Sequence, residues 1–217
     1  APKAAFAQLL KQFAQKGWKE LPGTYLDNQT GAAHVTKDGF ILALSASDLS
    51  SDPQKAGMVS VTIVNHGNVD SSKLPVPPGV KPFYSRPSET SYLTDAGVSE
   101  TAEACRKLLE AAGWEPYGTA SADPNSPMMY FKKNAIRVMA WISPTPAQNN
   151  KTSIRYSTDL LSADLPVPPN VPDPRYNDSD KSLRYDYPGE DIAPLIEVYT
   201  KKLTAQGWKP TTDKPAA

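Results

Sequence analysis

The stretch Ala102–Trp114, AEACRKLLEAAGW, decides how the whole chain is interpreted, because two similar stretches occur in the same sequence. FAQLLKQFAQKGW spans Phe6–Trp18, and IEVYTKKLTAQGW spans Ile196–Trp208. The three tryptophans are 114 − 18 = 96 and 208 − 114 = 94 residues apart. Apolar residues in each stretch recur at intervals of three and four, which places them on one face of a helix. We therefore expect three copies of one amphipathic helix.

Each stretch closes with a Gly-Trp pair, and this pair predicts how the helix ends. Glycine adopts the left-handed backbone of a helix stop without steric cost, because it lacks Cβ. The following tryptophan is then expected to fold back onto an apolar residue of the last turn, Phe13, Leu109 or Leu203. The residues given this structural role are Gly17, Trp18, Gly113, Trp114, Gly207 and Trp208.

Strand patterns follow the first two helices. Residues 32–44 and 129–140 are predicted to be hairpins, with turns at Asp38-Gly39 and Asn134-Ala135. One further strand is expected in each region, at 58–64 and 152–157. Leu-Pro-Val-Pro-Pro then occurs at 74–78 and again at 165–169, and because proline lacks an N–H donor, these stretches are predicted to be stiff connectors.

Beyond the connectors, short strands are expected near 91–94 and 183–187, each leading into the next helix. The predicted fold class is α+β, with pseudo-repeated modules that each pack a helix on an antiparallel sheet and are joined by proline-rich connectors. The expected division is a first helix-plus-three-strand module at 1–73, a complete strand-helix-three-strand module at 74–164 and a partial strand-and-helix module at 165–217. The leading strand of the first module is absent. Either the parent protein is longer, or the two partial modules complete each other.

The Leu-Pro-Val-Pro-Pro-Gly-Val entry at 74–80 and the helix ending in Leu-Leu-Glu-Ala-Ala-Gly-Trp at 108–114 give the module a family resemblance. It resembles uncharacterised repeat modules of secreted or cell-envelope proteins of bacteria such as Planctomycetes. The resemblance covers most of the chain and rests on packing motifs. It implies an extracytoplasmic setting and a helix packed on an antiparallel sheet, and it brings no catalytic residues with it.

The composition narrows the classes of partner. Lys plus Arg and Asp plus Glu both number 23, so no overall field favours nucleic acid or an anionic membrane. The longest apolar run, around Phe40 to Leu44, is the length of a strand, and no membrane insertion is expected. A single cysteine excludes an internal disulfide and any paired-cysteine metal site, and together with 22 prolines it favours a bacterial extracytoplasmic location.

The sequence offers little catalytic chemistry. Its two histidines, His34 and His66, have no neighbouring histidine or cysteine at metal-ligand spacing, so no metal or cofactor is expected. Nucleophile-elbow, P-loop and dinucleotide-binding motifs are absent. A hydrolase with an unrecognised site near His66 remains an alternative, which a nearby carboxylate would favour.

One sheet face stands out from this background. Alternation turns Ile136, Val138, Ala140 and Ile142 toward the helix, and the opposite face then carries aromatic and cationic side chains. The candidate ligand-binding residues on that face are Tyr130, Lys132, Arg137, Trp141 and Arg155. Rings beside arginines suit a glycan or a peptide. Alternatively, this face packs against the other sheet or against the third helix and buries Trp141.

The predicted function is a non-catalytic interaction or scaffolding module of a larger secreted or cell-envelope protein, with a glycan or other protein modules as partners. The alternative is a structural subunit that assembles through sheet edges or incomplete terminal modules.

Overall fold

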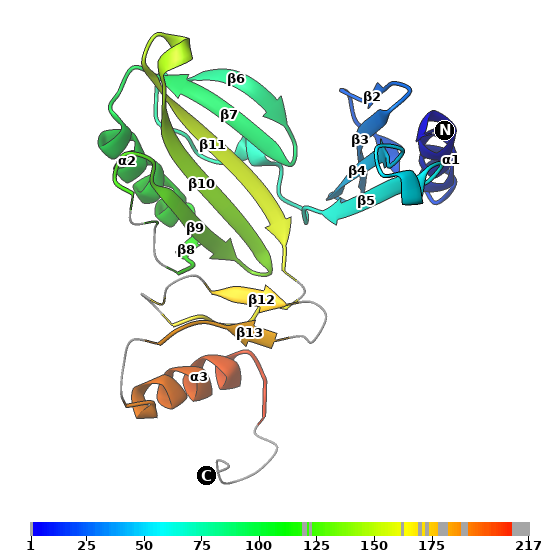
Figure 1. Ribbon diagram of the computed structural model, residues 1–217. Helices are drawn as coiled ribbons and strands as arrows, with labels where there is room; N and C mark the ends of the chain where they lie inside the picture. The colour runs from blue at the N-terminus through cyan, green and yellow to red at the C-terminus, as the bar shows by residue number, and fades with distance from the viewer. Residues whose placement is uncertain are drawn as a thin grey trace.

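The computed structural model describes residues 2–118, 121, 123–161, 163–168, 171, 174–177, 182–187 and 191–209. Three α-helices and three antiparallel sheets form the described part of the chain, so the predicted α+β class is confirmed (Figure 1). Short 3₁₀ segments lie at Pro53–Lys55, Ser71–Lys73 and Pro146–Gln148.

The first sheet is built from the N-terminal part of the chain. Helix α1 (Pro2–Gln15) is followed by β1 (Lys19–Glu20), β2 (Tyr25–Leu26), β3 (Thr30–Lys37), β4 (Phe40–Asp48) and β5 (Val59–Asn65). The strand order is β1-β3-β4-β5, with β2 also paired to β3. Phe6 from α1 is fully buried against Val35, Leu42 and Leu44. Asp38 and Gly39 form the β3–β4 turn with φ of 51° and 81°, the positive values that favour this residue pair in a hairpin.

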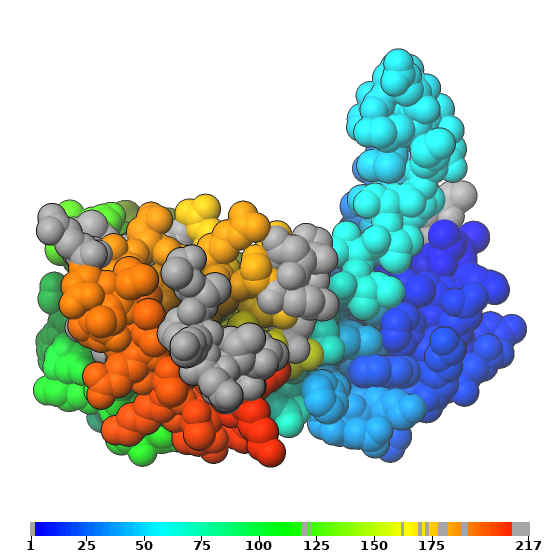
Figure 2. Space-filling view, turned by 90° about the horizontal axis from the view of Figure 1, so that it is seen from below, coloured from blue at the N-terminus to red at the C-terminus, as the bar shows by residue number. Residues whose placement is uncertain are grey.

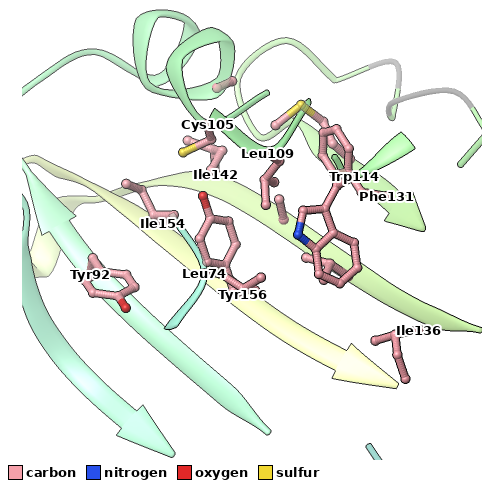
Figure 3. Close-up of a cluster of buried hydrophobic side chains, with 14 residues drawn as sticks. Leu74, Tyr92, Cys105, Leu109, Trp114, Phe131, Ile136, Ile142, Ile154 and Tyr156 are labelled. Atoms are coloured by element: carbon pink, nitrogen blue, oxygen red, sulfur yellow. The ribbon is translucent and has the colours of Figure 1, made fainter. Parts of the chain in front are cut away.

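The second sheet is larger and forms the centre of the molecule. Its elements are β6 (Lys81–Arg86), β7 (Glu89–Thr94), α2 (Val98–Ala111), β8 (Glu115–Pro116), β9 (Met128–Lys133), β10 (Ile136–Thr145) and β11 (Lys151–Leu160). The strand order is β6-β7-β11-β10-β9-β8. Strand β7, which precedes α2 in the chain, therefore pairs with β11, the last strand of this sheet in the sequence. Helix α2 covers one face, and the core between them contains Leu109, Trp114, Ile142, Ile154 and Tyr156 (Figure 3).

The third group consists of β12 (Arg175–Asn177), β13 (Ser182–Arg184) and α3 (Ala193–Ala205), and it lies beside the lower end of the second sheet in Figure 1. The Tyr185 hydroxyl donates a hydrogen bond of 2.9 Å to the Tyr199 hydroxyl. The apolar stripe of α3 is only partly covered: Ile192 and Ile196 are 60% and 46% exposed.

All three helices end at the Gly-Trp pairs. Gly17, Gly113 and Gly207 have φ of 84°, 80° and 87°. The amide of the following tryptophan donates to the carbonyl five residues earlier, on Phe13, Leu109 and Leu203, at 3.0–3.1 Å. The indoles differ in their surroundings: Trp114 is 6% exposed, Trp18 is half-buried against Phe13, and Trp208 is 58% exposed.

The proline-containing segment at 74–78 is packed against the second sheet, where the sequence predicted a spacer. Leu74 is 6% exposed and belongs to the core of that sheet, and the Tyr156 hydroxyl donates to the Pro75 carbonyl at 3.1 Å. Leu74 and Val76 drive this packing, because burying them removes apolar surface from water. Of the second predicted connector, residue 169 lies outside the described residues.

The first and second sheets meet at a joint that contains both histidines. His34 Nε2 lies 2.6 Å from the Ser88 hydroxyl, and these residues are 8% and 5% exposed. His66 Nδ1 is hydrogen-bonded to the Thr158 carbonyl, and the two imidazole centroids are 6.4 Å apart. Gly67, with φ of 75°, has a backbone so close to Ile136 that a Cβ there would lie 2.0 Å from Ile136 Cδ1.

Stability is expected to fall on acidification because of this joint. Burial, together with the positive charge of Arg86 and with His66, lowers the pKa of His34 below its ordinary value of 6.5. The unfolded chain therefore binds a proton at a pH where the folded chain excludes it, so the stabilisation is complete above pH 6.5 and is lost as the pH falls below it. We therefore expect the free energy of unfolding to be lower at pH 5 than at pH 7.5.

Urea unfolding at the two pH values measures this loss. His34→Gln, which keeps a group able to hydrogen-bond to Ser88, should show a smaller pH dependence than the parent chain. An unchanged pH dependence in the variant would assign the effect to other groups.

Candidate ligand-binding face of the second sheet

The two faces of the second sheet differ sharply in chemistry. Ile136, Val138, Ala140 and Ile142 are 0–5% exposed and face α2. Arg137, Met139 and Trp141 alternate with them along β10 and are half-buried on the opposite side. We call the face opposite α2 the outer face. The alternation follows from the two-residue period of a strand, so the sequence alone assigned these residues to their faces.

Trp141 and Arg155 lie side by side on the outer face. Trp141 pairs with Arg155 on β11, Arg155 pairs with Ser91 on β7, and Ser91 pairs with Tyr84 on β6. The Arg155 guanidinium carbon is 5.9 Å from the centre of the Trp141 ring. The indole Nε1–H donates to the Ser126 hydroxyl at 2.7 Å, which holds the ring in place and leaves part of it exposed.

A cavity of about 410 Å³ opens over this row of residues. Its aromatic lining comes from Trp141, Phe83 and Tyr84, and the last two are 59% and 38% exposed. The strand pairing of β6 with β7 shifts between Pro82 and Tyr84 and skips Phe83. An irregularity of this kind re-aims side chains, and it accounts for two consecutive aromatic residues lining the same cavity. The polar lining consists of Glu89, Ser91, Ser143, Thr145, Ser153 and Arg155.

The charges in the cavity are already matched. Arg155 Nη2 donates to Glu89 Oε2 at 2.5 Å, and the two side chains are 41% and 32% exposed. The site therefore presents aromatic surface, hydroxyl groups and a neutralised ion pair. It lacks an unbalanced charge of the kind that would attract an ionic ligand.

The other three predicted ligand-binding residues lie further along the outer face. Arg137 sits over the Tyr130 ring at 5.3 Å and makes two hydrogen bonds to Asp159, at 2.9 and 3.1 Å. Lys132 is bonded to Asp164 and to the Leu165 carbonyl, and its side chain is 11% exposed.

The segment that follows β11 thus covers part of this end of the face. Of the five residues predicted from the sequence, the structure brings Trp141 and Arg155 together in the cavity and turns Tyr130, Arg137 and Lys132 toward other contacts.

Phe83, Tyr84, Glu89 and Ser126 were missed by the sequence analysis. Alternation around Trp141 on β10 gave no indication of Phe83 and Tyr84, because β7 and β11 separate β6 from β10 and the pattern of β6 is broken at Phe83. Phe83, Tyr84 and Glu89 enter the site because the crossover pairs β7 with β11, and β6 pairs with the other edge of β7.

Among the described residues, the surroundings of the two histidines do not have the geometry of a catalytic site. The hydrogen-bond partners of His34 and His66 are a serine hydroxyl and a backbone carbonyl, not a carboxylate. Within the described ranges, no three His, Cys, Asp or Glu residues gather as metal ligands. Cys105 is fully buried, and burial raises the pKa of its thiol to about 11.

No helix in the part of the chain that the structure describes is long and apolar enough to cross a membrane. Comparisons with protein families, curated proteins and solved structures found no match.

Proposed function

We propose that this chain is a non-catalytic interaction module of a larger secreted or cell-envelope protein, and that it binds a neutral saccharide through the outer face. The observation that carries the proposal is the partly exposed Trp141 ring, held by Ser126 and in cation–π contact with Arg155, in a cavity with Phe83 and Tyr84. Aromatic faces accept the apolar side of a sugar ring, and the surrounding hydroxyl groups exchange hydrogen bonds with its edge.

The electrostatics favour a saccharide over a charged peptide. Arg155 and Glu89 neutralise each other, so a charged ligand would have to break their ion pair before it gained a partner. A neutral polyhydroxyl ligand can hydrogen-bond to both groups while they stay paired. The composition, with one cysteine and 22 prolines, supports an extracytoplasmic setting for such binding.

The proposal includes a repeated architecture, in which the second sheet with α2 repeats the first sheet with α1. Helices α1 and α2 end at residues 15 and 111, which are 111 − 15 = 96 apart. The pair Lys19↔Thr36 of the first sheet has its counterpart 96 residues later in Glu115↔Lys132 of the second. Equal offsets in helix end and strand register support a common unit, as expected of repeat proteins.

Replacing Trp141 with alanine is expected to weaken saccharide binding about tenfold or more, because the stacking surface is lost. Titration with neutral tetrasaccharides of the cello, chito, malto and laminari series, followed by isothermal calorimetry, measures the affinity. Trp208→Ala, which removes an exposed indole outside the cavity, is the matched control and should bind as the parent chain does.

Two results would contradict the proposal. One is the absence of binding to any of the four series at millimolar concentration. The other is a loss of folding stability in Trp141→Ala as large as that of a core tryptophan, which would show that Trp141 serves packing instead of binding.

A further inference from the structure

The edge strand of the first sheet, β5, is apolar and exposed. Strand β5 reads Val-Ser-Val-Thr-Ile-Val-Asn and contains no charged residue or proline, the features that usually protect a sheet edge. Val61, Ile63 and Val64 are 47%, 50% and 41% exposed. In the space-filling view, the region around β5 projects clear of the rest of the molecule (Figure 2).

In the second sheet, the strand that corresponds to β5 is β11, and its apolar side chains are covered. In the first sheet Leu44 pairs with Ile63, and in the second sheet Ala140, 96 residues after Leu44, pairs with Tyr156. In the same way Ala46 pairs with Val61, and Ile142 pairs with Ile154. Tyr156 and Ile154 are fully buried, whereas Ile63 and Val61 are about half exposed. Corresponding strand positions in the two sheets thus differ in whether another segment of the chain packs on them.

Residues 74–94, together with α2, cover Ile154 and Tyr156. Strand β7 pairs antiparallel with β11 from Glu89↔Ser157 to Thr94↔Thr152. The Tyr92 ring meets the Tyr156 ring edge-on at a centroid distance of 6.5 Å. Leu74 is buried in the same core, and the Pro75 carbonyl accepts the Tyr156 hydroxyl. The part of the cover that does not come from α2 is therefore a hairpin preceded by an apolar, proline-containing stretch.

We propose that β5 is a docking edge for a partner protein that supplies such a segment: Leu-Pro-Val-Pro-Pro or a similar apolar stretch, followed by a β-hairpin. The second strand of the hairpin adds antiparallel to β5, as β7 adds to β11, and its apolar stretch covers Val61 and Ile63. Strand addition of this kind takes its affinity from main-chain hydrogen bonds and its specificity from side-chain pockets. The helix of the completed unit is α1, already in place on the first sheet.

This site is separate from the proposed saccharide site. It lies on the first sheet and uses none of the residues around Trp141, so either proposal can fail without the other.

The probe is a fluorescein-labelled synthetic peptide with the sequence of residues 74–94, LPVPPGVKPFYSRPSETSYLT, which the structure shows seated on β11. Titration of the full chain into the peptide, followed by fluorescence anisotropy, should give saturable binding with a dissociation constant on the order of 10–100 μM, since part of the interaction free energy is spent on ordering the peptide. A peptide of the same composition in scrambled order should not bind. Hydrogen exchange should slow at residues 59–65 when the peptide is present.

Two substitutions at neighbouring residues test which face of β5 contacts the peptide. Ile63→Ser removes the apolar side chain that corresponds to Tyr156 and should weaken binding about tenfold. Val64→Ser lies on the opposite face, where the counterpart in the second sheet is already Ser157, and should change affinity less than about twofold. Both side chains are largely exposed, so both variants are expected to fold.

The proposal is overturned if the peptide does not bind, if both substitutions weaken binding equally, or if the protection appears at 151–160 instead of 59–65. It is also overturned if sedimentation equilibrium shows a dimer of the chain that Ile63→Ser dissociates. That result would identify a second copy, and not a hairpin partner, as the occupant of β5.

Discussion

Replacing Trp114 with alanine is expected to lower the free energy of unfolding by roughly 3–5 kcal/mol. The indole is 6% exposed and packs in the core of the second sheet together with Leu109 and Phe131 (Figure 3). Its removal forfeits the buried apolar area and leaves a cavity that the surrounding sheet and α2 can fill only in part. Urea unfolding followed by far-ultraviolet circular dichroism measures the loss independently of tryptophan fluorescence.

The chain contains its own control for this experiment. Trp208 follows a glycine with φ of 87° and donates its amide to the Leu203 carbonyl, the same local arrangement as at Trp114, yet it is 58% exposed. Trp208→Ala should therefore change stability by less than about 0.5 kcal/mol. If both variants lost the same stability, the contribution would come from the helix end itself and not from burial.

Phe6→Ala is expected to cost about as much, roughly 3–5 kcal/mol, but within the first sheet. The Phe6 ring is fully buried and lies so close to the β3 backbone that a Cβ on Gly31 would be 2.8 Å from Phe6 Cδ1. The core around Phe6 shares no residue with the core around Trp114. Hydrogen exchange should therefore rise at residues 30–48 and stay unchanged at 136–160.

Phe40→Ala is the matched control, because Phe40 lies on β4 of the same sheet and is 38% exposed. It should cost less than about 1 kcal/mol. Equal loss of protection in both sheets of Phe6→Ala would show instead that the joint at His34 and Ser88 couples them into one cooperative unit.

Much of the local structure could be predicted from the sequence. The three-and-four spacing of apolar residues predicted α1, α2 and α3, and the Gly-Trp pairs predicted where each of them ends. The sequence also predicted the turns at Asp38-Gly39 and Asn134-Ala135 and the alternation along β10. These signals are local, because they depend on backbone geometry within a few residues.

The candidate site was only partly predictable. Alternation placed Trp141 and Arg155 on one face, but it could not separate them from Lys132, whose ammonium group is taken up by Leu165 and Asp164. Phe83 and Tyr84 were missed because β6 joins the sheet through β7, and the shift in pairing at Phe83 breaks the alternation that would reveal a strand. The buried role of Leu74 was missed because prolines on both sides of Val76 suggested a spacer.

The sequence by itself therefore determined the helices, their ends, the hairpins and the α+β class, because each of these follows from interactions between residues close together in the chain. Only the tertiary structure decided what those elements cover. One Gly-Trp motif gives a buried indole at Trp114 and an exposed one at Trp208. Burial depends on which distant segment packs on a surface, and strands that pair across 58 or more residues, such as β7 and β11, leave no periodic trace in the sequence.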